Sequence, residues 1–329
     1  MKRRAMLTNR LLVLSACLLI PGISTFAQSN LTGFWVGLFH EDAPERLPGP
    51  QPGDYLELPI NEAGRMRADS YDANRISAVE EFQCRPHGGD YSMRGLSVPL
   101  RVWEEYDPDT QQLIAIRTRT AWMEMERTIY MDGRPHPPEY AHHTWQGFST
   151  GVWEGNMLSV TTTHLKPSYL RRNGVPRSAT ATFTDHWIRH GNYLTVTTFI
   201  DDPVFLTEPL VRSSNWAFDP TVKMGTYSCE PGTEMFVPEG TVPHYLPGQN
   251  SGQDSFSAEF SDFFGLPFEA TRGGAETLYP EYRQEMGEIP TPPQCWRYCF
   301  CTSLVNCAER PSASQSISRL RFENERTPE

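Results

Sequence analysis

Histidines are concentrated in the middle of the chain, where they could act in acid–base chemistry or hold a metal ion. Six of them lie close together in the sequence: His136, His142, His143, His164, His186 and His190. On an extended strand, His186 and His190 would lie about 13 Å apart, too far for one metal ion. We therefore predict no metal and no cofactor. His164 and His186 remain candidate acid–base groups, and the plainer interpretation is a set of solvated surface histidines.

A carboxylate on an apolar strand face is the second candidate for chemistry. In residues 178–189 alternate side chains share a face, and Asp185 shares its face with Ala181, Phe183 and Trp187. A carboxylate there must pair, be protonated or lose its hydration. Three arginines on other expected strands could reach it: Arg117, Arg127 and Arg212. We predict a buried Asp185–arginine pair, which is either structural or a catalytic acid.

A long polar connection separates two expected strands, Trp122–Met131 and Met157–His164. Loops of this length in compact domains are usually functional or disordered, and the tryptophans in this one argue against disorder. Asp132-Gly133-Arg134 is expected to form a tight turn that leaves Arg134 free to bind a carboxylate or the backbone. The candidate ligand-binding residues of the connection are Asp132, Arg134, His136, Trp145, Trp153 and Glu154.

The same connection holds Gly147-Phe148-Ser149-Thr150-Gly151, which matches the nucleophile-elbow pattern of serine hydrolases. That elbow requires an apolar strand before the serine and a helix after it. Polar residues precede Ser149 here, and Gly151 and Gly155 favour a turn after it. The sequence therefore argues against a catalytic Ser149.

Two motifs in this region resemble those of a known family. MDGRPHPP at residues 131–138, followed by W-x-G-x-S-x-G-x-W-E-G at residues 145–155, resembles a largely uncharacterised family of secreted bacterial proteins. The resemblance covers roughly Cys84 to Cys229, and more loosely the chain as far as Tyr282. It implies an antiparallel β domain and export, and supplies no reaction. Gly33-Phe34-Trp35 also resembles the Gly-x-Trp signature of lipocalin-type barrels, whose tryptophan plugs one end.

Short alternating segments and few helical patterns predict a mainly β protein. The expected strands are residues 31–37, 96–103, 112–118, 121–131, 157–164, 178–189, 192–200, 211–218 and 223–229. Helices are expected within residues 61–82 and 253–264. We predict an antiparallel meander closing into a lipocalin-like barrel, since closure removes exposed strand edges.

The first 27 residues read as a secretory signal, with a basic start, an apolar core and a small-residue exit. A lipoprotein cleavage box at Cys17 is the alternative. Six cysteines follow, which predicts disulfides in an oxidising compartment. Cys84 and Cys229 flank the expected sheet as a candidate pair, and the other four lie within residues 295–307, where local disulfides are expected.

The expected organisation is a signal peptide at 1–27, a barrel domain at 28–229, an extension packed on the barrel at 230–310 and a disordered tail at 311–329. The formal charge of −11 disfavours nucleic acid as a partner, and no later segment is apolar enough to span a membrane. Two functions remain open. The first is a periplasmic or secreted barrel that binds a small, largely apolar molecule; the second is a barrel enzyme that uses Asp185, His164 or His186.

Overall fold

A computed structural model of the protein describes residues 28–38, 50, 52–72, 80–93, 99–232, 238–242, 244–253 and 255–288. The expected signal peptide, the cysteines within residues 295–307 and the expected tail lie outside these described residues. No helix in the described part of the chain is long and apolar enough to cross a bilayer.

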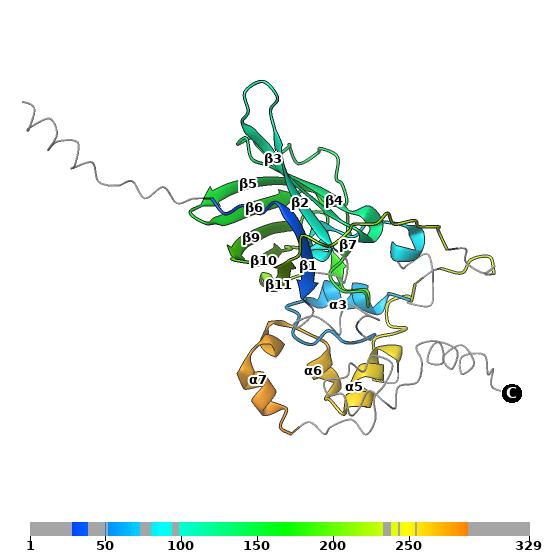
Figure 1. The fold of residues 1–329 in the computed structure, drawn as a ribbon. Coiled ribbons are helices and arrows are strands. Elements are labelled where there is room, and N and C mark those ends of the chain that lie inside the picture. Colours follow the sequence, from blue (N-terminus) through cyan, green and yellow to red (C-terminus); the bar gives the residue numbers. More distant parts are fainter. Residues whose placement is uncertain are drawn as a thin grey trace, which may run out of the picture.

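Nine strands form a closed barrel (Figure 1). They are β1 (Gly33–Leu38), β2 (Leu100–Tyr106), β3 (Leu113–Thr120), β4 (Glu126–Tyr130), β5 (Phe148–Glu154), β6 (Met157–Thr163), β9 (Thr182–His190), β10 (Tyr193–Asp201) and β11 (Leu210–Phe218). Neighbours in sequence are neighbours in the barrel, and β1 closes it by pairing with both β2 and β11. A separate two-stranded sheet joins β7 (Ser168–Tyr169) to β8 (Pro176–Arg177). The prediction of a mainly β barrel is confirmed.

One pair of strands corrects the predicted antiparallel meander. β4 and β5 run parallel, with Ile129 beside Ser149 and Tyr130 beside Thr150. Residues 131–147, which we call the crossing connection, must therefore return along the outside of the barrel before β5 begins. β5 itself was not predicted, because its inward positions are Ser149 and Gly151 rather than large apolar residues. A Cβ at Gly151 would lie 2.6 Å from the Met131 sulfur and 2.9 Å from Ile129 Cγ2, so a larger residue there would force these side chains to shift.

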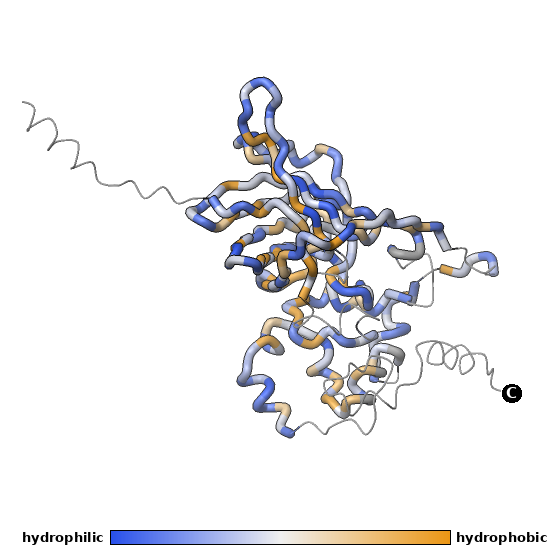
Figure 2. The backbone as a smooth tube through the Cα atoms, viewed as in Figure 1, coloured by the Kyte–Doolittle hydropathy of each residue, from blue (hydrophilic) through white to orange (hydrophobic). Residues whose placement is uncertain are grey.

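Side chains from all around the barrel fill its interior. Alternation places one face of each strand inward, and Figure 2 shows the resulting hydrophobic stretches along the strands. The largest of these buried side chains are Trp35, Trp187 and Trp216, each 0% exposed. The indole N–H of Trp35 donates to the Leu31 carbonyl at 3.0 Å, and the Arg189 guanidinium lies over the indole ring. Trp35 therefore packs inside the barrel, in contact with the chain that leads into β1 and with the end of β9.

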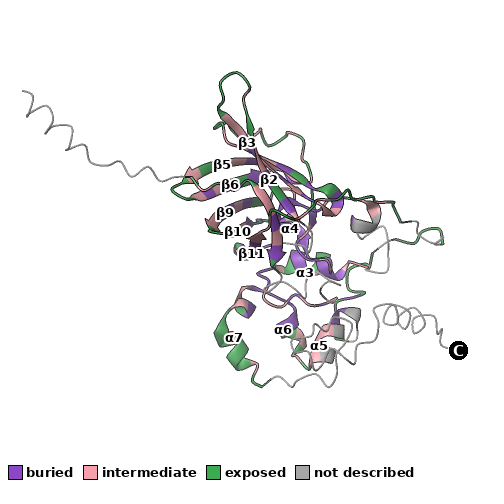
Figure 3. Ribbon diagram, in the orientation of Figure 1, coloured by how far each residue is buried: buried purple, intermediate pink, exposed green. Residues whose placement is uncertain are grey.

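The opposite end rests on a second apolar cluster and on the helices (Figure 1). The helices are α3 (Glu62–Asp69), α4 (Gly89–Ser92), α5 (Glu259–Phe264), α6 (Phe268–Thr271) and α7 (Pro280–Glu285), with 3-10 turns at Glu80–Gln83, Trp122–Glu124, Phe256–Ala258 and Ala275–Leu278. Asn61 caps α3, as expected, but that helix ends at Asp69. The buried Asp69 joins α3 to the extension, because Tyr55 and Arg272 both bind its carboxylate. Figure 3 shows that α7 is the exposed side of this extension.

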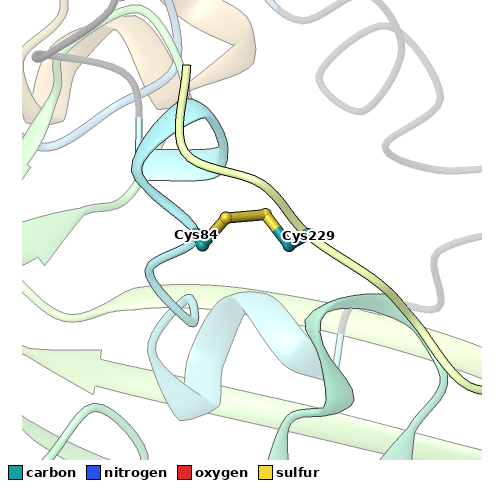
Figure 4. The surroundings of a disulfide bond; sticks show 2 residues. All are labelled: Cys84 and Cys229. Carbon is teal, nitrogen blue, oxygen red and sulfur yellow. A yellow bond between two sulfur atoms is a disulfide. The ribbon is translucent and has the colours of Figure 1, made fainter. Parts of the chain in front are cut away.

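Residues 80–93, which we call the plug, pack into the same end of the barrel. Met93 belongs to the barrel core, and Gly89 faces the buried Arg127. Cys84 of the plug forms a disulfide with Cys229, as the positions of these cysteines suggested (Figure 4). Residues 223–229 therefore reach the plug as an extended segment and not as the strand that the sequence predicted.

Candidate functional site

A buried ion pair lies inside the barrel, beneath the plug. Arg127 on β4 and Asp185 on β9 are 2% and 1% exposed, and Arg127 Nη2 lies 2.7 Å from Asp185 Oδ2. That contact lacks the angles of a hydrogen bond, so charge attraction holds it. The prediction that Asp185 is buried against an arginine is confirmed, and Arg127 is the partner among the three candidates.

Hydroxyl groups from three other strands complete this pair. Arg127 Nε donates to Ser149 Oγ at 3.0 Å, and its Nη2 donates to Thr162 Oγ1 at 2.6 Å. On the other side, Thr198 donates to Asp185 Oδ1 at 2.6 Å. These bonds compensate part of the hydration that each charge loses on burial. They also fix Ser149 on a strand as an acceptor for Arg127, so it lacks the strand–turn–helix setting of a nucleophile elbow.

A second buried charge pair connects the plug to the barrel. Arg177 on β8 is 1% exposed, and its Nε lies 3.6 Å from Asp90 Oδ1. Nearby, the His87 ring stacks on both Tyr91 and Trp122, and His87 Nδ1 is 3.1 Å from Glu80 Oε2. Arg177 also lies over the Phe183 ring, 5.3 Å from its centroid. The plug is thus attached by charge and stacking as well as by its disulfide.

The predicted acid–base residues do not share one cavity. Asp185 points inward, whereas His186 is the next residue on β9 and points outward against Phe199. His164 follows β6 and packs beneath the crossing connection, where its Nε2 lies 2.9 Å from the Pro138 carbonyl. The structure brings His164 close to His136 and His143 and keeps it apart from Asp185.

An external hollow lies between the outer face of β4 and the crossing connection, with a volume of about 300 Å³. Its lining residues are Glu126, Thr128, Tyr130, Pro137, His142, Thr144, Gln146, Gly147 and Phe148. Outward-pointing alternate residues of β4 form one wall, and the connection forms the other. At Gly147 (φ +71°) a Cβ would lie 2.6 Å from the Thr163 carbonyl oxygen, so the turn into β5 requires glycine.

A chain of hydrogen bonds holds the crossing connection against β5 and β6. The Pro138 carbonyl can only accept, so His164 donates from Nε2 and accepts at Nδ1 from the Thr163 hydroxyl (2.7 Å). Thr163 Oγ1 in turn accepts from His136 Nδ1 at 2.7 Å, and His136 Nε2 accepts from the Thr150 hydroxyl at 2.8 Å. We call these four side chains the histidine–threonine chain. When both rings are neutral, each member donates one hydrogen bond to the next, from the Thr150 hydroxyl through His136, Thr163 and His164 to the Pro138 carbonyl.

Backbone and ring contacts extend this attachment along the connection. The amide of Thr144 donates to the His164 carbonyl, and the amide of Lys166 donates to the Thr144 carbonyl, both at 2.9 Å. His143 Nδ1 donates to the Leu165 carbonyl at 2.8 Å, and its ring lies 5.2 Å from that of His164. The connection is therefore a fixed wall of the hollow.

The other predicted ligand-binding residues are dispersed. Asp132 and Arg134 form an exposed ion pair within one turn, so the carboxylate that Arg134 binds is that of Asp132; the Arg134 guanidinium also lies over the Tyr130 ring at 3.9 Å. Trp145 packs beneath Lys166, Trp153 packs against the barrel core, and Glu154 is exposed at the end of β5. None of the predicted set lines the hollow itself, although His136 contacts the lining residue Phe148 and Arg134 contacts the lining residue Tyr130.

Sequence reasoning missed most of the residues that line the hollow. The alternation of Glu126, Thr128 and Tyr130 along β4 was a usable signal for one wall, because the residues between them are the buried Arg127 and Ile129. The other wall depends on the reversal of the connection, which the sequence does not reveal. Among the described residues no group of three or more His, Cys, Asp or Glu side chains is arranged to hold a metal ion, and the absence of a metal remains a prediction.

The described residues thus define a closed, side-chain-filled β-barrel with an external hollow. Comparison of the chain with family models, curated proteins and solved structures finds no match in any of the three.

Proposed function

We propose that this is a secreted or periplasmic β-barrel protein that binds a small, largely apolar molecule in the external hollow. The observation that carries the proposal is the hollow itself. Its volume of about 300 Å³ is at the lower end of the range of small-molecule sites. Its walls combine the rings of Tyr130 and Phe148 with polar groups of Glu126, Thr144 and Gln146. The rings can pack against an apolar body, and the polar groups can orient it by hydrogen bonds.

The position of the site differs from that in a barrel that encloses its ligand. Three tryptophans and the Arg127–Asp185 pair occupy the interior here, so the space for a ligand lies outside the strands. The enzyme alternative needs at least two titratable groups that converge on one position. Asp185, His164 and His186 do not converge, and we therefore propose binding.

Secretion is supported by the disulfide and by the motif resemblance. The Cys84–Cys229 bond fits an oxidising compartment, and residues 1–27 have the pattern of an export signal. The MDGRPHPP and W-x-G-x-S-x-G-x-W-E-G motifs resemble those of secreted bacterial proteins. In this structure the motifs correspond to the crossing connection and β5, which are the elements that build the hollow and its support.

Filling the hollow is expected to abolish ligand binding. Thr128 lies on the β4 wall, and Thr128→Trp would place an indole in the space that an apolar ligand needs. We expect the neutral fluorescent dye N-phenyl-naphthylamine to bind the wild type saturably at one site, and the variant at least about tenfold more weakly. Fluorescence titration measures both affinities.

Thr161→Trp is the matched control, because Thr161 is an exposed threonine on the outer face of β6 and is not among the residues that line the hollow. It should bind the dye as the wild type does. Equal affinity in the Thr128→Trp variant, or no saturable binding to the wild type, would contradict the proposal.

A further inference from the structure

We propose that His136 and His164 form a pH-operated latch that fastens the crossing connection to β5 and β6, and that acid opens this latch and releases the ligand. The proposal has two parts. Opening of the connection depends only on the histidine–threonine chain, whereas release of a ligand rests on the proposed function of the hollow.

Thr163 limits the number of positive charges that the histidine–threonine chain can hold. Its hydroxyl lies 2.7 Å from Nδ1 of both histidines, and it has one hydrogen to donate. With both rings neutral, Thr163 donates to His164 and accepts from His136, so every polar atom is satisfied. If both rings were protonated, both Nδ1 atoms would donate to the same oxygen, and the hydroxyl hydrogen would lose its acceptor. Two positive rings joined through one hydroxyl would also repel each other.

The described residues around the two rings supply no counter-ion for a protonated ring. On the connection, Asp132 pairs with Arg134, while Glu139 and His142 are exposed. On the strands packed here, Glu126 of β4 pairs with Arg117, and β5 and β6 carry no charged residue except the exposed Glu154. The remaining nearby charged or titratable side chains are Lys166, which lies against Trp145, Tyr130, which lies beneath Arg134, and His143, which lies beside His164. Among the described residues no carboxylate forms an ion pair with His136 or His164.

The direction of the pH effect follows from the surroundings of His136. Burial lowers the pKa of His136 below its ordinary value of 6.5, and the nearby His164 lowers this pKa further. A histidine whose pKa is lower in the folded state contributes stability that is complete above the unfolded pKa and is lost as the pH falls through the folded value. The attachment of the connection is thus strongest above about pH 6.5 and weakens in acid.

The histidine–threonine chain is coupled to the hollow through contacts with residues that line it. The His136 ring lies edge-on to Phe148 at 5.2 Å, and Phe148 lies 5.1 Å from Tyr130; both of these aromatic residues line the hollow. His164 binds the carbonyl of Pro138, next to the lining residue Pro137. Movement of the connection away from β5 would therefore remove one wall of the hollow.

Hydrogen exchange of the full mature protein at pH 7.5 and pH 5.0 tests the latch. After correction for the intrinsic pH dependence of exchange, we expect the amides of residues 131–147 to exchange at least about tenfold faster at the lower pH, with the barrel strands unchanged. Trp145 fluorescence should change over the same range, because its ring leaves Lys166. His136→Gln and His164→Asn cannot acquire the charge, and both should lose this acceleration. Asparagine is chosen because residue 164 has φ +57°.

His186→Gln is the matched control, because this histidine packs against Phe199 and is not part of the histidine–threonine chain. The variant should behave as the wild type. Exchange that does not change with pH in the wild type would overturn the latch whether or not the variants fold. Acceleration that persists in His136→Gln and His164→Asn would overturn it as well.

If the connection opens in acid but N-phenyl-naphthylamine does not bind at pH 7.5, the latch stands and the proposed function fails. If the dye binds while exchange stays constant, the binding function stands and the latch fails.

Discussion

Replacing Asp185 with alanine is expected to lower the free energy of unfolding by roughly 3–5 kcal/mol. The side chain is 1% exposed and balances the charge of Arg127, which is also buried. Without the carboxylate, the guanidinium would keep its bonds to Ser149 and Thr162 but would have no counter-charge. Urea denaturation followed by circular dichroism measures the loss.

Two further variants separate charge burial from other effects. Asp132→Ala removes a carboxylate from an exposed arginine pair, and should cost less than about 1 kcal/mol. The double variant Asp185→Leu with Arg127→Met removes both buried charges and should be more stable than Asp185→Ala. A single variant that unfolds at the wild-type urea concentration would contradict the interpretation that this pair supports the barrel.

Loss of the Cys84–Cys229 disulfide is expected to have an effect of similar size. The bond joins residues separated by 145 positions, and closing so long a loop restricts the unfolded chain strongly. Changing both cysteines to serine should lower the free energy of unfolding by roughly 3–5 kcal/mol. The plug should then exchange amide hydrogens faster than the strands do, because the other attachments that the structure shows for it are noncovalent.

A reducing agent provides the control for this prediction. It should destabilise the wild type about as much as the double serine substitution does, and it should have little further effect on the substituted protein. Unfolding curves of the wild type that coincide with and without the reductant would argue against a stabilising disulfide in solution.

Strand periodicity predicted much of the fold and one of the buried clusters. Alternation along residues 178–189 placed Asp185 on the inner face with Phe183 and Trp187, and the cost of an unpaired buried charge then required an arginine. This reasoning needs only the local sequence and the physics of burial. The Cys84–Cys229 pair followed in the same way from its position on either side of the strands.

The hollow could not be predicted in this manner. β5 presents Ser149 and Gly151 to the interior, so its alternation carries no hydrophobic signal. The direction of β5 depends on the path of the crossing connection, and that path depends on contacts such as His136 with Thr150 and Thr163. These contacts join a loop to two strands, and no periodic pattern encodes them. The charge pair of Asp90 and Arg177 was missed for the same reason.

The disulfide also has a consequence for assembly. It closes a covalent ring that contains eight of the nine barrel strands and leaves β1 outside. β1 must pair with β2 and with β11, which come from opposite ends of the domain sequence, and such non-local pairing forms slowly. Without β1 in place, β2 and β11 would present two open edges to which the β1 strand of a second copy could pair. β1 is therefore both the strand that completes the barrel and the one that two molecules would exchange in a domain-swapped dimer.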